Sequence, residues 1–390
     1  MMVMKKSSSS FFSSRRVLWF GWKLVIALSV SLCLMALIRL RQYSQPETSS
    51  SSSYRLSRSR SRIHSPHLED SAKIAFLFLA RRDLPLDFLW GDFFENADAA
   101  HFSIYIHSEP GFVFDDSTTR SSFFYNRQLT NTIKVSWGEA SMIQAERLLL
   151  DAALEDPANQ RFVLLSDSCV PLYNFTYVYS YLMSSSSKSF VDSFHDKKEG
   201  RYNPKMSNVI PRNKWRKGSQ WFTLTKRHAE VVVDDDVVFP AFKKFCRRRP
   251  AVDPSKGKEN IKLQKQHNCI PDEHYLPTLF AMSELELELE RRTVTYTQWN
   301  ESASGMETKS WHPVTFGYTN VGPEQIKRIQ DIKQIYYETE LRTELCIINS
   351  TSVPCFLFAR KFSRAAAMRL LSEGVTGPFD PTRLLSSSLH

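Results

Sequence analysis

The sequence predicts an α/β protein in which helices cover both faces of a mostly parallel sheet. Three apolar runs of strand length, Lys73–Ala80, His101–Glu109 and Arg161–Ser168, end in polar residues. Helical patterns lie between them, at Asp87–Phe94 and Met142–Ala153. Continuously apolar strands are typical of sheets buried on both faces, and strands that alternate with helices are typical of parallel sheets.

The polar residues at these strand ends are candidate site residues. Ligands of parallel α/β sheets bind beyond the carboxyl ends of the strands. Arg81, His107 and Asp167 stand at the ends of the three runs, so we expect them to converge on one edge of the sheet. Each of these residues taken alone is more often a solvated strand end.

The pattern is less regular farther along the chain. Gly218–Leu224 and Arg292–Asn300 are predicted strands, and Arg227–Val233 and Ser363–Leu371 are predicted helices. The run Ser283–Glu290 alternates with the period of a strand, although leucine and glutamate also favour helix, and its structure is left open.

The amino terminus predicts a membrane anchor. The uncharged run Leu24–Ile38 becomes about 20 residues long if Val17–Gly21 joins it, which suffices to span a bilayer. Basic residues precede it and no small-residue cleavage site follows, which favours an uncleaved signal anchor with a cytosolic amino terminus. The predicted organisation is a cytosolic tail at 1–16, a transmembrane signal anchor at 17–38, a disordered Ser/Arg-rich stem at 39–72, a folded domain at 73–375 and a C-terminal tail at 376–390.

The net charge of +10 does not predict nucleic-acid binding, because it is unevenly distributed. Residues 1–72 contain 11 Lys/Arg and 3 Asp/Glu, whereas residues 73–390 contain 40 and 38. The folded part therefore lacks the basic excess typical of proteins that bind a phosphate backbone. We expect no nucleic-acid partner.

A secretory location would allow the cysteines of the folded part to pair. Cys346 and Cys355 close a short segment and are the favoured disulfide. Cys246 with Cys269 is the second pair, which leaves Cys169 unpaired. Candidate N-glycosylation sites are Asn174, Asn300 and Asn349.

The stretch CIPDEHYLPTLF, Cys269–Phe280, places two acids and a histidine behind a proline at the start of a helical pattern. Proline suits the first helical position and first-turn acids favour the positive end of the helix dipole, so Glu273 can be an ordinary first-turn acid. The alternative is that Glu273 is a general base, with His274 as a rival for that role. The stretch alone leaves these readings open.

Two acidic clusters, Ser166–Ser168 and Asp234–Asp236, raise the alternative of a bound divalent cation. Paired carboxylates at a strand end can hold a hard cation against a diphosphate, but the first cluster has only Asp167. The second is expected to be a solvated surface run. A metal-free site is preferred, in which Arg360 and Lys361 are the candidates to meet the charge of a diphosphate.

Six motifs follow one another along the chain: WGEASMI (Trp137–Ile143), LLSDSCVPL (Leu164–Leu172), KGSQWFTL (Lys217–Leu224), PDEHYLPTL (Pro271–Leu279), TYTQWN with a following WHP (Thr295–Asn300, Trp311–Pro313) and LFARKFS (Leu357–Ser363). In this order they resemble the core-2/I-branching β-1,6-N-acetylglucosaminyltransferases and their peptide O-xylosyltransferase relatives, glycosyltransferase family 14, and most closely its plant branch of brittle-culm type. The resemblance extends from about Lys73 to about Leu371.

The resemblance implies a GT-A-like, Rossmann-type fold and a single-pass type II Golgi membrane protein. It also implies inverting, metal-independent transfer of a sugar, GlcNAc in first place, from a UDP-sugar to a glycan or glycoprotein acceptor. No cofactor is expected. The site residues are Glu273 as the base; Asp167, Arg360 and Lys361 for the donor, joined by Arg81 from its strand end; and Gly218, Ser219 and Trp221 on the acceptor side.

The resemblance is incomplete at Ser108, where the family usually has an aspartate. The sequence leaves the donor open between UDP-GlcNAc and UDP-xylose, and cell-wall glycans are suggested as acceptors only by the plant resemblance. Two alternatives stay open: a noncatalytic glycan-binding module on the same fold, which would need neither Glu273 nor Lys361, and a cation-dependent transferase that uses Asp167 and Asp234–Asp236.

Overall fold

The computed structural model describes residues 72–184, 188–197, 200–248, 267–299, 313–348 and 350–374. The predicted cytosolic tail, anchor and most of the stem lie outside the described residues, as does the predicted C-terminal tail. Across the described ranges, none of the helices is both long enough and apolar enough to traverse a bilayer.

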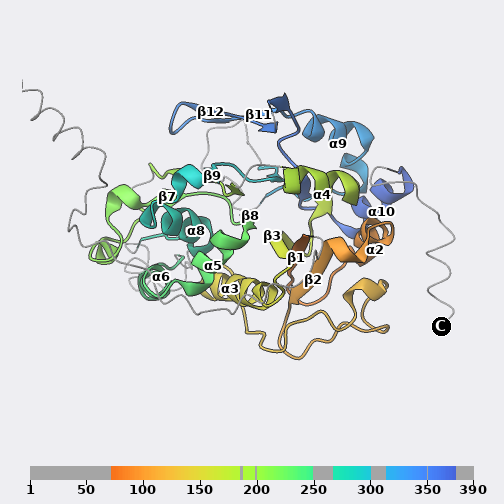
Figure 1. Cartoon of the computed structure of the whole chain (residues 1–390), viewed down its shortest axis with the longest axis horizontal. Helices are drawn as coiled ribbons and strands as arrows, with labels where there is room; N and C mark the ends of the chain where they lie inside the picture. Colours follow the sequence, from red (N-terminus) through yellow and green to blue (C-terminus); the bar gives the residue numbers. More distant parts are fainter. Residues whose placement is uncertain are drawn as a thin grey trace, which may run out of the picture. The chain divides into compact units, whose positions relative to one another are not determined.

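Among the described residues, six strands form the main sheet in the order β2-β1-β3-β8-β5-β9 (Figure 1). Three of them are the apolar runs of the sequence: β1 (Lys73–Leu79), β2 (Phe102–His107) and β3 (Asn159–Ser166). β1 pairs in parallel with both neighbours, so that Leu79 lies beside His107 and Ser166 at the carboxyl edge. The three predicted strands are confirmed to within two residues at each end.

The other half of the sheet departs from the parallel pattern. β8 (Thr223–Thr225) runs antiparallel to β3 and to β5 (Ser189–Phe190), and β5 pairs in parallel with β9 (Leu289–Glu290). The predicted strand Gly218–Leu224 is right only at its end. Before β8 the backbone instead meets other elements, because the Gly218 amide donates to a carbonyl of a helix.

One face of the sheet packs against three helices, of which the sequence predicted the first and the last of those named below. Phe76 and Phe78 point to this face and are fully buried. They meet the aromatic side of α2 (Asp87–Glu95), together with α4 (Phe175–Ser184) and α10 (Arg364–Ser372). The aromatic rings interlock edge to face, the arrangement that aromatic pairs prefer.

The opposite face has a second core. Ala75 and Leu77 alternate with the residues of the first core, as the two-residue period of a strand requires. They pack against α3 (Ser141–Leu154), α5 (Lys226–Asp234) and α8 (Pro271–Met282). Helices therefore cover both faces (Figure 1), and this mixed α/β architecture fits the GT-A-like expectation.

Smaller elements surround the main sheet. A second sheet has the order β10-β15-β4, and α9 (Pro323–Gln330) precedes a hairpin, β11–β12, which is drawn at the top of Figure 1. The bounds are β4 (Val170–Pro171), β6 (Phe194–His195), β7 (Arg216–Lys217), β10 (Thr295–Thr297), β11 (Gln334–Tyr337), β12 (Arg342–Leu345), β13 (Ile347–Ile348), β14 (Thr351–Ser352), β15 (Phe358–Arg360) and α6 (Val238–Phe245).

Two acidic runs have structures that the sequence did not show. Ser283–Glu290, left open above, forms a short 3-10 turn at Glu286–Glu288 followed by β9. The expectation that Asp234–Asp236 is a solvated run is wrong for Asp235, which is buried. Its carboxylate accepts hydrogen bonds from backbone amides at the start of α6 and from the Tyr275 hydroxyl, so it is a helix cap.

Two disulfides lie within the described residues. Cys246, at the end of α6, is bonded to Cys269, just before α8, and Cys346 is bonded to Cys355 across the β13–β14 hairpin. Cys169 is free and buried. The first disulfide holds the segment that leads into α8, the helix that begins with the PDEH motif.

Candidate active site

The carboxyl ends of two neighbouring parallel strands meet through an ion pair. Arg81 follows β1 and Asp167 follows β3, and the Arg81 Nε lies 2.8 Å from the Asp167 Oδ2. The hydrogen bond that Arg81 donates to Asp167, together with the charge of that carboxylate, raises the pKa of Arg81. The Arg81 side chain is 88% exposed, whereas that of Asp167 is 10% exposed. The exposed guanidinium of Arg81 is therefore held in place by the buried carboxylate of Asp167.

His107 stands at the same edge, but its imidazole faces another segment. Its Nε2 accepts a hydrogen bond from the Ile133 amide at 3.1 Å. Burial lowers the pKa of His107 to about 4, so the ring is neutral at physiological pH. The expected convergence of three side chains is therefore met by Arg81 and Asp167, while His107 fixes the loop at Ile133.

Arg360 and Lys361 bring two further cations to this edge, at the end of β15. The Arg360 guanidinium lies over the Trp221 ring, 4.3 Å from its centroid, and its buried Nε has no hydrogen-bond partner among the described residues. Burial lowers the pKa of Lys361, and the nearby charges of Arg360 and Arg81 lower it further. Like charges that lower the pKa of one another, with the carboxylate of Asp167 opposing them, make a positively charged edge that suits an anionic group.

Glu273 lies in the first turn of α8, and both its carboxylate and its backbone carbonyl bind other segments. Pro271 occupies the first turn, as the sequence predicted. The Glu273 Oε2 lies 2.9 Å from the Lys217 Nζ and 3.2 Å from an Arg201 guanidinium nitrogen. The Glu273 carbonyl accepts a hydrogen bond from the Gly218 amide at 2.8 Å. The KGSQW and PDEH motifs therefore contact each other directly.

Two cations set the charge of the Glu273 carboxylate. Lys217 and Arg201 both contact Oε2, at 2.9 and 3.2 Å. The side chain is 24% exposed. Burial alone would raise the pKa of Glu273, but the charge of Lys217, aided by that of Arg201, outweighs it and lowers the pKa. The group is therefore an ionised carboxylate that two cations hold at Oε2.

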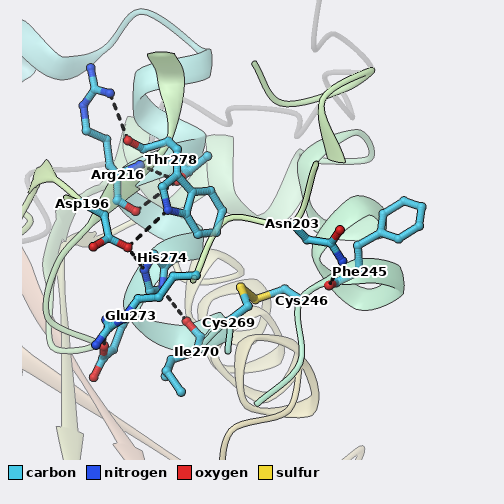
Figure 2. The surroundings of a disulfide bond; sticks show 12 residues. Asp196, Asn203, Arg216, Phe245, Cys246, Cys269, Ile270, Glu273, His274 and Thr278 are labelled. Carbon is cyan, nitrogen blue, oxygen red and sulfur yellow. Dashed lines mark hydrogen bonds and ion pairs between the residues drawn. A yellow bond between two sulfur atoms is a disulfide. The ribbon is translucent and has the colours of Figure 1, made fainter. Parts of the chain in front are cut away.

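His274 has a structural environment. The ring is fully buried and stacks on Trp215, with centroids 4.6 Å apart. Its Nδ1 lies 2.8 Å from the Ile270 carbonyl oxygen and its Nε2 lies 3.1 Å from Asp196 (Figure 2). Burial lowers the pKa of His274. Both nitrogens are thus engaged inside the protein, which argues against the rival base.

Asp272 precedes the base in the chain and interacts electrostatically with a strand-end cation as well. It is buried, and its Oδ1 has no hydrogen-bond partner among the described residues. Burial, and then the charge of Glu273, raise the pKa of Asp272 to about 7, while the charges of Lys217 and Arg360 oppose the rise. One side chain therefore interacts electrostatically with both halves of the site.

The three residues expected on the acceptor side, Gly218, Ser219 and Trp221, do not form one group in the structure. A Cβ on Gly218 would lie 1.8 Å from the Asp192 carbonyl oxygen, so only glycine fits there, beside Glu273. Ser219 accepts a hydrogen bond from the Trp221 amide. Trp221 is 4% exposed and lies beneath Arg360. Trp221 therefore contacts the cation Arg360, whereas Gly218 contacts the candidate base Glu273.

Sequence reasoning missed Lys217, Arg201 and Asp272. Lys217 and Asp272 stand in motifs that were quoted for their neighbours, so a signal existed. Arg201 had none, because it lies in an irregular segment far from α8 in sequence. No three His, Cys, Asp or Glu side chains of the described ranges gather in a way that would hold a metal ion. Asn174 is exposed and caps α4, and the other two sequon asparagines lie outside the described residues.

The fold and the site define the class of protein. A mixed α/β sheet has cations at its carboxyl edge, and an ionised glutamate lies one residue from an aspartate that interacts with them. The family described as Core-2/I-Branching enzyme matches residues 74–330. Glycosyltransferase BC10 of Oryza sativa subsp. japonica is 56% identical over 305 residues, which cover 77% of this chain and 76% of that protein.

These findings together are those of a glycosyltransferase. The chain belongs to the core-2/I-branching enzyme family, glycosyltransferase family 14.

Proposed function

We propose that this glycosyltransferase moves a sugar, GlcNAc in first place, from a UDP-sugar to a hydroxyl of a glycan or glycoprotein, with inversion and without a metal ion. Glu273 is the general base. The observation that carries the proposal is a partly exposed carboxylate that two cations contact at Oε2 and whose pKa they lower, so that it is ionised and able to accept a proton.

The reaction requires one proton acceptor and a counter-charge for the leaving group. The acceptor hydroxyl gives its proton to Glu273 Oε1 as its oxygen bonds to the anomeric carbon, and the bond from that carbon to the diphosphate breaks. UDP leaves with the bonding electrons. Arg360 and Lys361 meet the charge on the diphosphate, with Arg81 at the same edge.

We place the reaction in the Golgi lumen. The predicted signal anchor supports a type II orientation, and two disulfides fit an oxidising compartment. Plant cell-wall glycoproteins remain the suggested acceptors.

The test is release of UDP by the purified luminal domain from a panel of UDP-sugars, with acceptor glycans and with or without EDTA. Glu273→Gln should lower the transfer rate by about two to four orders of magnitude, because glutamine cannot accept the proton. Binding of UDP should be unchanged. In the wild type, activity should be flat at neutral pH and fall only below the ordinary pKa of glutamate, since the pKa of Glu273 is lowered.

Glu286→Gln is the matched control. Glu286 is paired with Arg216, the neighbour of Lys217, and is 27% exposed, close to the 24% of Glu273. Its loss should leave the rate within a few-fold of wild type. A Glu273→Gln variant that transfers sugar as fast as this control would refute the base, and complete loss of activity in EDTA would favour the cation-dependent alternative.

A further inference from the structure

Lys217 reaches the base from a short strand pair outside the main sheet. β7 pairs with β6, which places Lys217 opposite Phe194. The ammonium lies 2.9 Å from Glu273 Oε2 and 5.7 Å from the centroid of the Phe194 ring. The half-buried Asp192 lies against the residue that follows Lys217, because its carbonyl oxygen packs on Gly218. Burial raises the pKa of Asp192, and the charge of Lys217 opposes that rise. Lys217 therefore interacts electrostatically with two carboxylates, Glu273 and Asp192, and forms an ion pair with Glu273.

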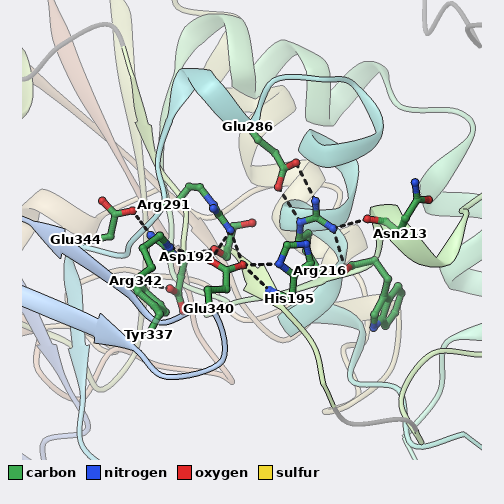
Figure 3. A network of polar contacts seen from close by, with 12 residues as sticks. Asp192, His195, Asn213, Arg216, Glu286, Arg291, Tyr337, Glu340, Arg342 and Glu344 are labelled. Atoms are coloured by element: carbon green, nitrogen blue, oxygen red, sulfur yellow. Dashed lines mark hydrogen bonds and ion pairs between the residues drawn. The ribbon is translucent and has the colours of Figure 1, made fainter.

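The carboxylate of Asp192 accepts a hydrogen bond from the hairpin β11–β12. The Tyr337 hydroxyl donates to Asp192 Oδ1 at 2.5 Å (Figure 3). The Arg342 guanidinium covers the Tyr337 ring, 4.1 Å from its centroid, and the ring also packs on Phe194. The hydrogen bond from Tyr337 stabilises the negative charge of Asp192. Asp192 therefore competes less strongly for Lys217, which favours the ion pair between Lys217 and Glu273.

Glu340 fastens this hairpin to β6. Its carboxylate accepts from the His195 amide at 2.8 Å and from Arg291 and Arg342, each at 2.8 Å (Figure 3). Burial alone would raise the pKa of Glu340, but these hydrogen bonds and charges outweigh it and lower the pKa to about 2. The carboxylate stays ionised across the useful pH range, so the hairpin stays attached.

We propose that Lys217 is a positioning residue for sugar transfer, which holds Glu273 by Oε2 so that Oε1 faces the acceptor hydroxyl, and that Tyr337 of β11 keeps Lys217 in this place by engaging Asp192. The inference rests on the proposed role of Glu273 as the base. It adds to that role a function for the hairpin, which lies far from α8 in sequence.

Four charged or titratable groups face Glu273. Lys217, Arg201 and His274 lower its pKa, and the carboxyl group of Asp272 beside it interacts unfavourably with its charge. Removal of the lysine leaves Arg201 at 3.2 Å, opposed by burial and by Asp272. The pKa of Glu273 should then rise, and the base should be protonated at a higher pH than in the wild type.

The experiment is the pH profile of kcat/KM for Lys217→Met, Lys217→Arg and Lys214→Met. An opposite charge in contact shifts a carboxyl pKa by about 1–3 units, so the acidic limb of Lys217→Met should move up by about one unit or more. Lys217→Arg should restore most of the wild-type profile. Lys214→Met is the control, because Lys214 is paired only with the exposed Glu284 in the described structure.

Tyr337→Phe provides an independent arm. It keeps the ring but frees Asp192 to compete for Lys217, so its acidic limb should move in the same direction by a smaller amount. The carboxyl infrared band that Glu273→Gln removes gives the same titration without turnover. Profiles of Lys217→Met and Tyr337→Phe that both coincide with wild type would overturn the inference, even where Glu273→Gln is inactive. An active Glu273→Gln would instead refute the proposed function itself.

Discussion

The two halves of the site are built by different forces. The strand-end half, with Arg81 and Asp167, extends from β1 and β3, whose residues are almost entirely buried between two apolar cores. The base half takes Glu273 from the first turn of α8, but the cations that hold its carboxylate come from the two-residue strand β7, paired with β6, and from the irregular segment at Arg201.

The difference shows where stability and chemistry separate. In the strand-end half, apolar burial fixes the backbone, and the polar side chains at the strand ends contribute little to that burial. In the base half, Lys217 and Arg201 both hold Glu273 in place and set its pKa. In the first half, substitutions in the apolar strands should therefore affect stability alone and substitutions of the polar strand-end residues should affect donor binding alone, whereas in the second half stability and catalysis should change together. The predictions below test this division.

Phe76→Ala should have the largest effect. Phe76 is fully buried in β1 and contacts the rings of Trp90, Phe93 and Phe94. Truncation of such a residue lowers the free energy of unfolding by about 3–5 kcal/mol. Urea unfolding measures the loss, and calorimetry on the folded fraction should give an unchanged affinity for UDP. A weakened UDP affinity in folded protein would break the division.

Gly218→Ala should affect both properties at once. Its Cβ would meet the Asp192 carbonyl oxygen at 1.8 Å, and a backbone atom cannot rotate away. We expect destabilisation near the upper end of the about 1–3 kcal/mol typical of overpacking, with a loss of kcat in the remaining folded protein because Glu273 is displaced. Gly317→Ala is the control, since its Cβ would meet no atom nearer than 3.7 Å. Full activity of Gly218→Ala would contradict the tight coupling of the two motifs.

Lys361→Ala should weaken UDP binding with little change in stability. A hydrogen bond to a charged group is worth about 1.5–3 kcal/mol, which corresponds to a loss of about 10- to 150-fold in affinity. Isothermal titration with UDP measures it. Lys327→Ala, which removes an exposed lysine paired with Asp331, should leave the affinity unchanged. Equal affinities in the two variants would place the diphosphate elsewhere.

Asp272→Asn should have the smallest effect, and it should depend on pH. The pKa of Asp272 is raised to about 7 from 3.8, so the folded state retains a proton that the unfolded state releases. The wild type therefore loses stability as pH rises from about 4 to about 7. The variant lacks this loss, and its melting temperature relative to wild type should rise through that window and level off above it. A constant difference between pH 4 and 8 would contradict the raised pKa.

Sequence patterns predicted the first half of the molecule well. β1, β2 and β3 are long and apolar, so their burial dominates local preference, and the helices between them have clear periodicity. The prediction weakened where elements are short. Gly218–Leu224 has the composition of a strand, but the Gly218 amide donates its hydrogen bond to α8 and so does not pair with a neighbouring strand. Asp235 looked like a surface acid, but two helices meet around its carboxylate.

The sequence by itself determined the α/β class, the helix that begins with PDEH and the presence of two adjacent cations at the end of β15, because these depend on period, proline position and adjacent residues. Only the tertiary structure decided which cations hold Glu273 and which of its oxygens they contact. Lys217 and Arg201 are 56 and 72 positions away from Glu273 in the chain. An ion pair between distant segments depends on how the elements between them pack, and no local pattern encodes that packing.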